Sequence, residues 1–132
     1  MKQVLKTEKF KMELDLEYYE KAEFADCILN VSVESEYFAA STSLEVYRKS
    51  FFEFVKNLKN MYDSLDGSAK IEDAYEGRGY IEFASDSTGH INVKGLLIST
   101  LHNQELKFEN NFDQTYLGDF VSDLYNAYNE YL

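Results

Sequence analysis

The stretch FKMELDLEY, residues 10–18, indicates the fold class most directly, because its apolar and charged side chains alternate. Side chains of a β-strand point to opposite faces in turn, so this period of two places one row on a core and the other in solvent. The solvent row of this predicted strand is largely acidic. The apolar row is Phe10, Met12, Leu14, Leu16 and Tyr18, and the solvent row is Lys11, Glu13, Asp15 and Glu17.

A second stretch with the same period, CILNVSVES at residues 27–35, predicts a neighbouring strand. We expect residues 19–24 to join the two strands as a hairpin. The segment YFAAS, residues 37–41, predicts a short third strand. The outward positions of the second strand are Asn30, Ser32 and Glu34.

A helix is predicted next, because Thr42 and Glu45 have the three-residue spacing of a capping box just before an apolar-periodic segment. Gly67 is expected to follow the end of this helix. Apolar residues recur at three- and four-residue steps along one stripe, which indicates an amphipathic helix. The stripe contains Leu44, Tyr47, Phe51, Phe54, Val55, Leu58, Tyr62 and Leu65.

The polar run at residues 110–114, NNFDQ, has two interpretations: a ligand-binding cluster or the junction between a strand and a helix. Asp113 is a suitable N-cap because its carboxylate can accept a hydrogen bond from a first-turn amide. Phe112 is placed to pack back on that turn as a hydrophobic staple. We therefore favour the junction. The helix stripe after it contains Leu117, Phe120, Val121, Leu124, Tyr128 and Tyr131.

The remaining strands are expected at residues 69–74, 80–84, 90–98 and 104–110, with the loop SDSTGH joining the second and third of these. The predicted order is β-β-(β)-α-β-β-β-β-α. Short connections favour an α+β fold with a mostly antiparallel sheet of about six strands, and the two amphipathic helices would cover one face of it. Residues 1–132 are expected to form one domain.

Charge narrows the possible partners, because the formal net charge is −11. Such a field repels nucleic acid and anionic lipid and attracts basic partners. No apolar run is long enough for a membrane span, and the first residues lack the apolar stretch of a signal peptide, so we expect a cytoplasmic protein. The single cysteine, Cys27, excludes an intramolecular disulfide.

The residue pattern predicts no catalytic group, metal site or cofactor. His90 and His102 are too far apart for a typical zinc motif, and Cys27 lies in an apolar row without a neighbouring base. The carboxylates of the first strand form a solvated row rather than a desolvated pair in a cleft. The two glycines of YEGRGY, residues 75–80, fit a tight turn as well as a phosphate-binding loop.

What remains is a surface. If both helices cover one face of the sheet, carboxylates and amides from several strands share the other face, with Tyr80 as an aromatic anchor. This pattern fits a binding surface and also fits the ordinary wet face of an antiparallel sheet. The candidate partner-binding residues are Glu13, Asp15, Glu17, Glu34, Tyr80, Glu82, Asn92, Glu105 and Glu109.

Residues 65–124 carry the motifs LDGSAKIED, GYIEF, GHINVKG, LKFE and DQTYLGDFVSDLY, in that order. This succession resembles the WapI-like family of bacterial immunity proteins, the partners of wall-associated polymorphic toxins. The resemblance implies a small cytoplasmic protein that neutralises a cognate toxin domain, frequently a nuclease, by binding it. No family-wide inhibitory residues are carried over. The matching positions look structural: Gly89, His90, Val93, Gly95, Asp113, Gln114, Tyr116 and Leu117.

The leading hypothesis is therefore a non-enzymatic inhibitor, a monomer or weak dimer, that blocks a protein toxin domain through an acidic surface. One alternative is a small ligand-binding domain or enzyme, which would need a deep pocket with a titratable group of shifted pKa. Another is a module that self-associates through exposed sheet edges.

Overall fold

The computed structural model describes residues 2–18, 26–75 and 77–131, and it contains eight strands and two α-helices. The predicted hairpin connection at 19–24 lies outside the described residues. The strands are β1 (Lys2–Lys6), β2 (Phe10–Tyr18), β3 (Cys27–Ser35), β4 (Phe38–Val46), β5 (Gly67–Glu72), β6 (Tyr80–Ser85), β7 (His90–Ile98) and β8 (Glu105–Asp113). The helices are α1 (Arg48–Ser64) and α2 (Gly118–Tyr128), with 3₁₀ turns η1 (Gln114–Tyr116) and η2 (Asn129–Tyr131).

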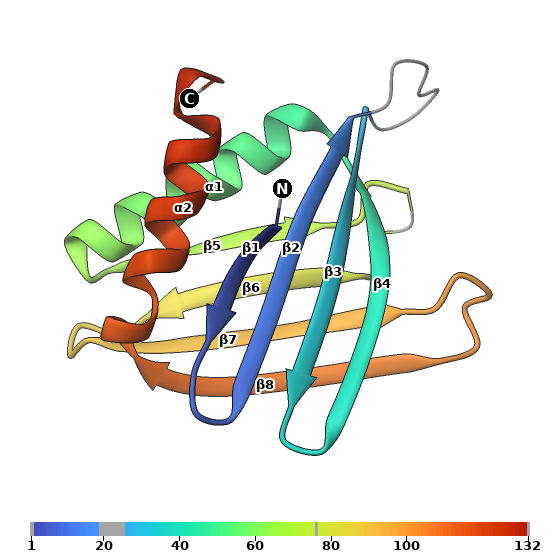
Figure 1. Cartoon of the computed structure of the whole chain (residues 1–132), viewed down its shortest axis with the longest axis horizontal. Helices are drawn as coiled ribbons and strands as arrows, with labels where there is room; N and C mark the ends of the chain where they lie inside the picture. The colour runs from blue at the N-terminus through green and yellow to red at the C-terminus, as the bar shows by residue number, and fades with distance from the viewer. Residues whose placement is uncertain (1, 19–25, 76, 132) are drawn as a thin grey trace.

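The strands form two antiparallel sheets rather than one, which corrects the prediction of a single sheet of about six strands. Sheet A has the order β1-β2-β3-β4 and sheet B the order β5-β6-β7-β8. Figure 1 shows the strands of sheet A crossing in front of those of sheet B, with both helices at one side of the two sheets. Each sheet therefore turns one face to a shared core and leaves its other face in solvent.

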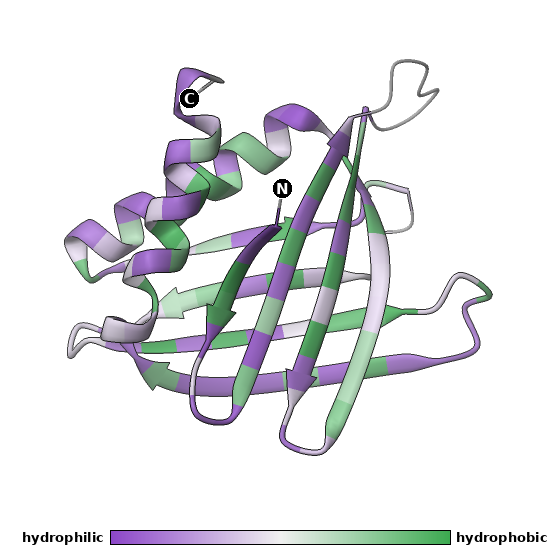
Figure 2. Ribbon diagram, in the orientation of Figure 1, coloured by the Kyte–Doolittle hydropathy of each residue, from purple (hydrophilic) through white to green (hydrophobic). Residues whose placement is uncertain are grey.

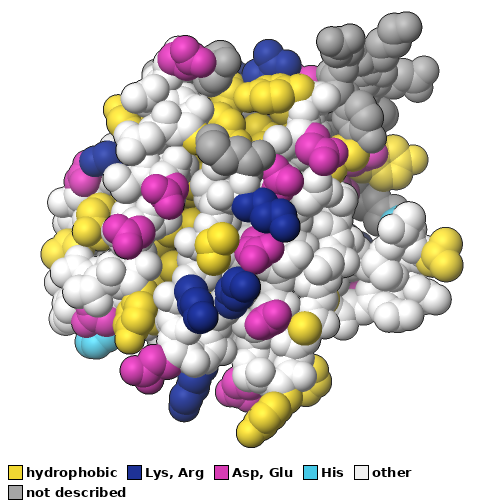
Figure 3. All heavy atoms as spheres, viewed as in Figure 1, with side chains coloured by type: hydrophobic (Ala, Val, Ile, Leu, Met, Phe, Trp, Pro, Cys, Tyr) yellow, Lys and Arg dark blue, Asp and Glu magenta, His cyan; other side chains and the backbone are white. Residues whose placement is uncertain are grey.

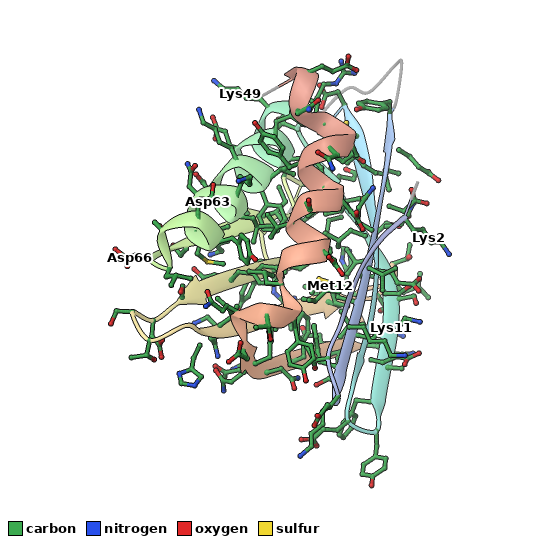
Figure 4. The ribbon with its side chains drawn as sticks, turned by 60° about the vertical axis from the view of Figure 1, so that its left-hand side comes forward. Lys2, Lys11, Met12, Lys49, Asp63 and Asp66 are labelled. Carbon is green, nitrogen blue, oxygen red and sulfur yellow. The ribbon has the colours of Figure 1, made fainter. Side chains whose placement is uncertain are left out.

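The core lies between the sheets and is closed at one side by the helices. In Figure 4, which shows sheet A nearly edge-on, Met12 points inward while Lys2 and Lys11 lie on the outer side. The rings of Phe54 in α1 and Phe120 in α2 each lie 6.2 Å from the ring of Phe83 in β6. The two helices thus cover the inner face of sheet B, and α2 also packs on β1.

Strand β1 was not predicted, because the stretch KQVLK inverts the usual pattern. Its buried residues are Gln3 and Leu5, whereas the apolar Val4 is exposed on the outer face. A strand with one apolar inward side chain gives almost no periodic signal. Its place in sheet A is set by pairing with β2.

The predicted boundary between the third strand and the first helix is wrong. Strand β4 continues to Val46, and α1 begins at Arg48 after the N-cap Tyr47. The Thr42 hydroxyl donates a 2.8 Å hydrogen bond to the Ile98 carbonyl of β7 instead of capping a helix. A contact with the other sheet therefore overrides the local capping pattern.

The later predictions are confirmed in outline, with shifted ends. Strands β5, β6 and β7 lie close to their predicted ranges, and β8 runs on to Asp113. Asp113 does act as an N-cap: its carboxylate accepts a 2.9 Å bond from the Thr115 amide, although α2 starts only after the turn η1. The run at 110–114 is a strand-to-helix junction, with Phe112 buried in the core. After α1, Leu65 takes the left-handed conformation and Gly67, at φ 104°, opens β5.

Candidate functional site

The nine predicted partner-binding residues do not share one surface, because they belong to both sheets. The two outer faces point away from each other, so the structure separates the residues into two groups. On sheet A lie Glu13, Asp15, Glu17 and Glu34. On sheet B lie Tyr80, Glu82, Asn92, Glu105 and Glu109.

The outer face of sheet A is ordered by cross-strand neighbours. In the register of the sheet, Asp15 lies between Lys2 and Asn30, and Glu13 lies between Val4 and Ser32. Cross-strand pairs such as these are the units that stabilise a sheet face.

The hydroxyl-rich half of this face links β3 to β4. The Ser32 and Ser41 hydroxyls are 2.8 Å apart, and the Ser43 hydroxyl donates a 2.7 Å bond to Oδ1 of Asn30. The face is therefore held by polar contacts and contains carboxylates, amides and hydroxyls.

Part of this face is hollowed. An open depression of about 600 Å³ lies over β2, β3 and β4 and reaches the loop between β7 and β8. Its polar lining offers acceptors from the carboxylates and both donors and acceptors from the hydroxyls. The lining includes Lys2, Glu13, Asp15, Asn30, Ser32, Ser41, Ser43 and Thr100.

Lysines interrupt the acidic row of sheet A. The Glu13 carboxylate lies 3.3 Å from Nζ of Lys11 and 3.8 Å from Nζ of Lys2. Figure 3 shows basic and acidic side chains interleaved on this face, beside a broad uncharged area. These ion pairs are solvent-exposed, and pairs of this kind contribute little to stability, so a partner's cations can compete for the carboxylates.

On the outer face of sheet B the acids are engaged by neighbours. Glu82 pairs with Lys94 at 3.6 Å, Glu105 forms an ion pair with Arg78, and Glu109 accepts a 2.8 Å bond from Nδ2 of Asn92. The Tyr80 ring lies under the Lys70 ammonium, 5.0 Å from it. The carboxylates of this face are therefore held by neighbouring side chains of sheet B.

Sequence reasoning missed a second feature, a hollow of about 230 Å³ beside β4. It lies between this edge strand, the loop after β5 and the loop after β7. Ser43, Glu45, Tyr75, Ile98, Thr100 and His102 are among its lining residues. The available signal was the uncharged run YFAASTSL, residues 37–44, in a chain that is 28% charged.

Two buried titratable groups in the described part of the chain have a shifted pKa. Cys27 is buried, and that burial raises the pKa of its thiol. Burial likewise raises the pKa of Tyr128 to about 12. Among the described residues, no group of three His, Cys, Asp or Glu side chains is placed to hold a metal ion.

His90 belongs to a turn. Its Nδ1 lies 2.9 Å from the Thr88 hydroxyl, and Asp86 accepts bonds from the Thr88 hydroxyl and from the amides of Thr88 and His90. The Thr88 hydroxyl is the main cause of a lowered Asp86 pKa. These contacts shape the hairpin between β6 and β7 and explain why a polar side chain occupies position 90.

No curated protein matches the chain. Among solved structures, the chain is similar to the plant transcriptional regulator PBF-2, with 11% identity and a TM-score of 0.47, covering 100% of this chain and 87% of that chain. It is also similar to WHY1 from Arabidopsis thaliana, with 12% identity and a TM-score of 0.49, covering 100% and 90% of the two chains.

No helix in the described part of the chain is both long and apolar enough to cross a membrane. The family match covers residues 3–132 and so includes both sheets and both helices. The chain belongs to the WapI-like family of immunity proteins.

Proposed function

We propose that this protein neutralises a toxin domain by binding it directly, without catalysis, through the outer face of sheet A. One observation carries this proposal. The chain belongs to an immunity-protein family, and the uncovered outer face of its sheet A is hollowed, with the carboxylates of Glu13 and Asp15 beside amides and hydroxyls. An immunity protein of this kind acts in the cytoplasm as a single domain and blocks the toxin's working surface.

Electrostatics supports a basic partner. A net charge of −11 raises the local concentration of cationic surfaces and speeds their association. A nuclease domain has a basic substrate groove, and carboxylates on a sheet face can occupy such a groove in place of phosphates. Binding would then exchange the internal pairs of Glu13 with Lys2 and Lys11 for pairs with the toxin.

The test is co-expression with a toxin domain. The probe is the C-terminal domain of a large secreted protein whose gene lies next to the gene for this chain, where the genome has such a neighbour, and the readout is growth and the dissociation constant of the purified pair. Wild-type chain should restore growth and bind more weakly as salt rises. Failure of the wild-type chain to bind or protect would overturn the proposed function for that partner.

Two matched triple variants locate the face. Glu13, Asp15 and Glu17 changed to Gln, Asn and Gln should weaken binding by about tenfold or more. The control changes Glu82, Glu105 and Glu109 to Gln, which alters the net charge equally on sheet B, and it should bind within about twofold of wild type. Equal loss from both variants would indicate only long-range charge, and loss from the control alone would move the interface to sheet B.

A further inference from the structure

The edge strand β4 has backbone groups that point away from its sheet. The Glu45 amide donates a 2.8 Å bond to Oδ1 of Asp73, and the Glu45 carbonyl accepts a 2.7 Å bond from the Ala74 amide. Both backbone groups of Glu45 therefore face away from β3. The pairing of β3 with β4 has no bulge, so the direction alternates regularly along the strand.

By this alternation, the amides and carbonyls of Ala39, Ser41 and Ser43 also face away from β3. Among the residues that the structure describes, no hydrogen bond to these backbone groups is found from any other segment. We call residues 39–43 of β4 the open edge. It offers donor and acceptor groups in the spacing that an added strand requires.

The other three edge strands are protected, whereas the open edge is not. Charged side chains and cover by a helix are the usual means by which proteins prevent unwanted strand pairing. The open edge has no charged side chain and no covering helix. Figure 2 shows β4 pale over most of its length, whereas β8 is strongly hydrophilic. The protecting residues are Lys2 and Lys6 in β1, Lys70 and Glu72 in β5, and Glu105, Lys107 and Glu109 in β8.

A shelf lies behind the open edge. Sheet B and the loop after β7, residues 99–104, extend past β4 in Figure 1, and we call this overhang the shelf. The hydrogen bond from the Thr42 hydroxyl to the Ile98 carbonyl links the shelf to β4. The hollow of about 230 Å³ lies between them. Exposed apolar side chains occur at the start of β4 and in the loop after β7: Phe38 is 64% exposed and Leu101 is 81% exposed.

We propose that the open edge binds an extended segment of the toxin as a fifth strand of sheet A. The inference rests on the proposed function and adds the mode of recognition. The segment pairs with the backbone of Ala39, Ser41 and Ser43. Its inward side chains are apolar, since they meet Ile98 and the hollow, and its outward side chains are polar or basic, since they extend the face that carries Glu13 and Asp15.

The structure favours such a segment over a second copy of this chain. The loop at Asp73 and Ala74 already occupies the strand position beside Glu45, so the free length is short. In a two-fold pairing of two open edges, both shelves would project toward each other on the same side of the joined sheet. Two copies would also bring together net charges of −11 each.

A proline tests the open edge because it removes one outward amide. Proline is tolerated on edge strands where the missing N–H faced solvent, so Ser41→Pro should fold. We expect it to weaken toxin binding by about tenfold or more and to lose protection. Ser41→Ala serves as the reference, because it loses the same hydroxyl contact with Ser32 but keeps the amide, and Ser41→Pro should bind about tenfold more weakly than this variant.

Amide exchange of the wild-type chain gives a readout that does not depend on any variant folding. On binding the toxin domain, the amides of Ala39, Ser41 and Ser43 should gain protection, whereas those of Ala40 and Thr42, which already bond to β3, should not change. A wild-type chain that binds with no change at these three amides would overturn this inference and leave the proposed function standing. No binding at all would overturn the proposed function.

A concentration-dependent dimer that Ser41→Pro abolishes, seen by sedimentation of the chain alone, would assign the open edge to a second copy and overturn the inference as well.

Discussion

Single residues show where local chemistry decides structure and where it does not. The Asp113 cap can be predicted from the sequence, because an aspartate just before an apolar helical stripe is placed to accept a hydrogen bond from a first-turn amide. Its carboxylate does accept such a bond from the Thr115 amide. Thr42 has equally good capping spacing, yet its hydroxyl bonds to Ile98, which is distant in sequence. Such a contact is absent from any local pattern, so this residue could not be placed by spacing alone.

Gly95 provides a residue-scale prediction. A Cβ added there would lie 2.5 Å from the Tyr80 carbonyl oxygen and 2.6 Å from Cζ of Phe108. Gly95→Ala should therefore lower the free energy of unfolding by about 1–3 kcal/mol, measured by urea denaturation. Lys94→Ala, one position away on the outer face, should change it by no more than about 0.5 kcal/mol. Equal stability of both variants would show that the Tyr80 carbonyl and the ring of Phe108 can both shift without cost.

At the scale of elements, period-two stretches predict most strands, because one row of each faces the core. Strand β2 is predicted at its observed bounds, Phe10–Tyr18, and β7 at His90–Ile98. Strand β1 escapes prediction because its buried row holds the polar Gln3. Strand β4 is only half predicted, since its small hydroxyl-bearing residues give weak alternation and its last residues imitate a helix start.

The link between β4 and β7 carries a prediction about the two sheets. Thr42→Val keeps the shape of the side chain but removes the donor to the part-buried Ile98 carbonyl. The free energy of unfolding should fall by about 1 kcal/mol. Ser43→Ala, which removes an exposed hydroxyl bond on the same strand, should cost less. If the two variants cost the same in thermal or chemical unfolding, the contact between the sheets does not contribute as described.

For the whole molecule, the number of sheets could not be inferred from the chain. Periodicity shows which face of a strand is buried but not which strands pair. That choice depends on contacts between the sheets, such as the bond from Asn110 in β8 to Ser35 at the end of β3. As a result, the sequence pattern places the nine candidate residues on one surface, whereas they lie on two outer faces. The family resemblance is confirmed over nearly the whole chain, but it names no contact residues.

Cys27 reports on the whole fold, since it is the only thiol and is fully buried. In native protein it should react with a maleimide only at the rate of global unfolding, and fully in denaturant. Burial raises its pKa above the ordinary 9.0, so the neutral thiol is favoured in the folded state. This contribution to stability is present below pH 9 and is lost as pH rises through the folded pKa. Rapid labelling of native protein would show that the inner face of sheet A opens locally.

Each helix packs on strands from the other half of the chain. Helix α1 follows sheet A in the sequence but packs on β5 and β6 of sheet B, and α2 follows sheet B but packs on β1 of sheet A. A nick between Leu65 and Gly67 would leave the first fragment without α2, which packs on β1, and the second without α1, which packs on β5 and β6. Neither fragment alone can hide its apolar surface, so they should regain structure only by reassociating, and fusing them to separate proteins would make a split reporter.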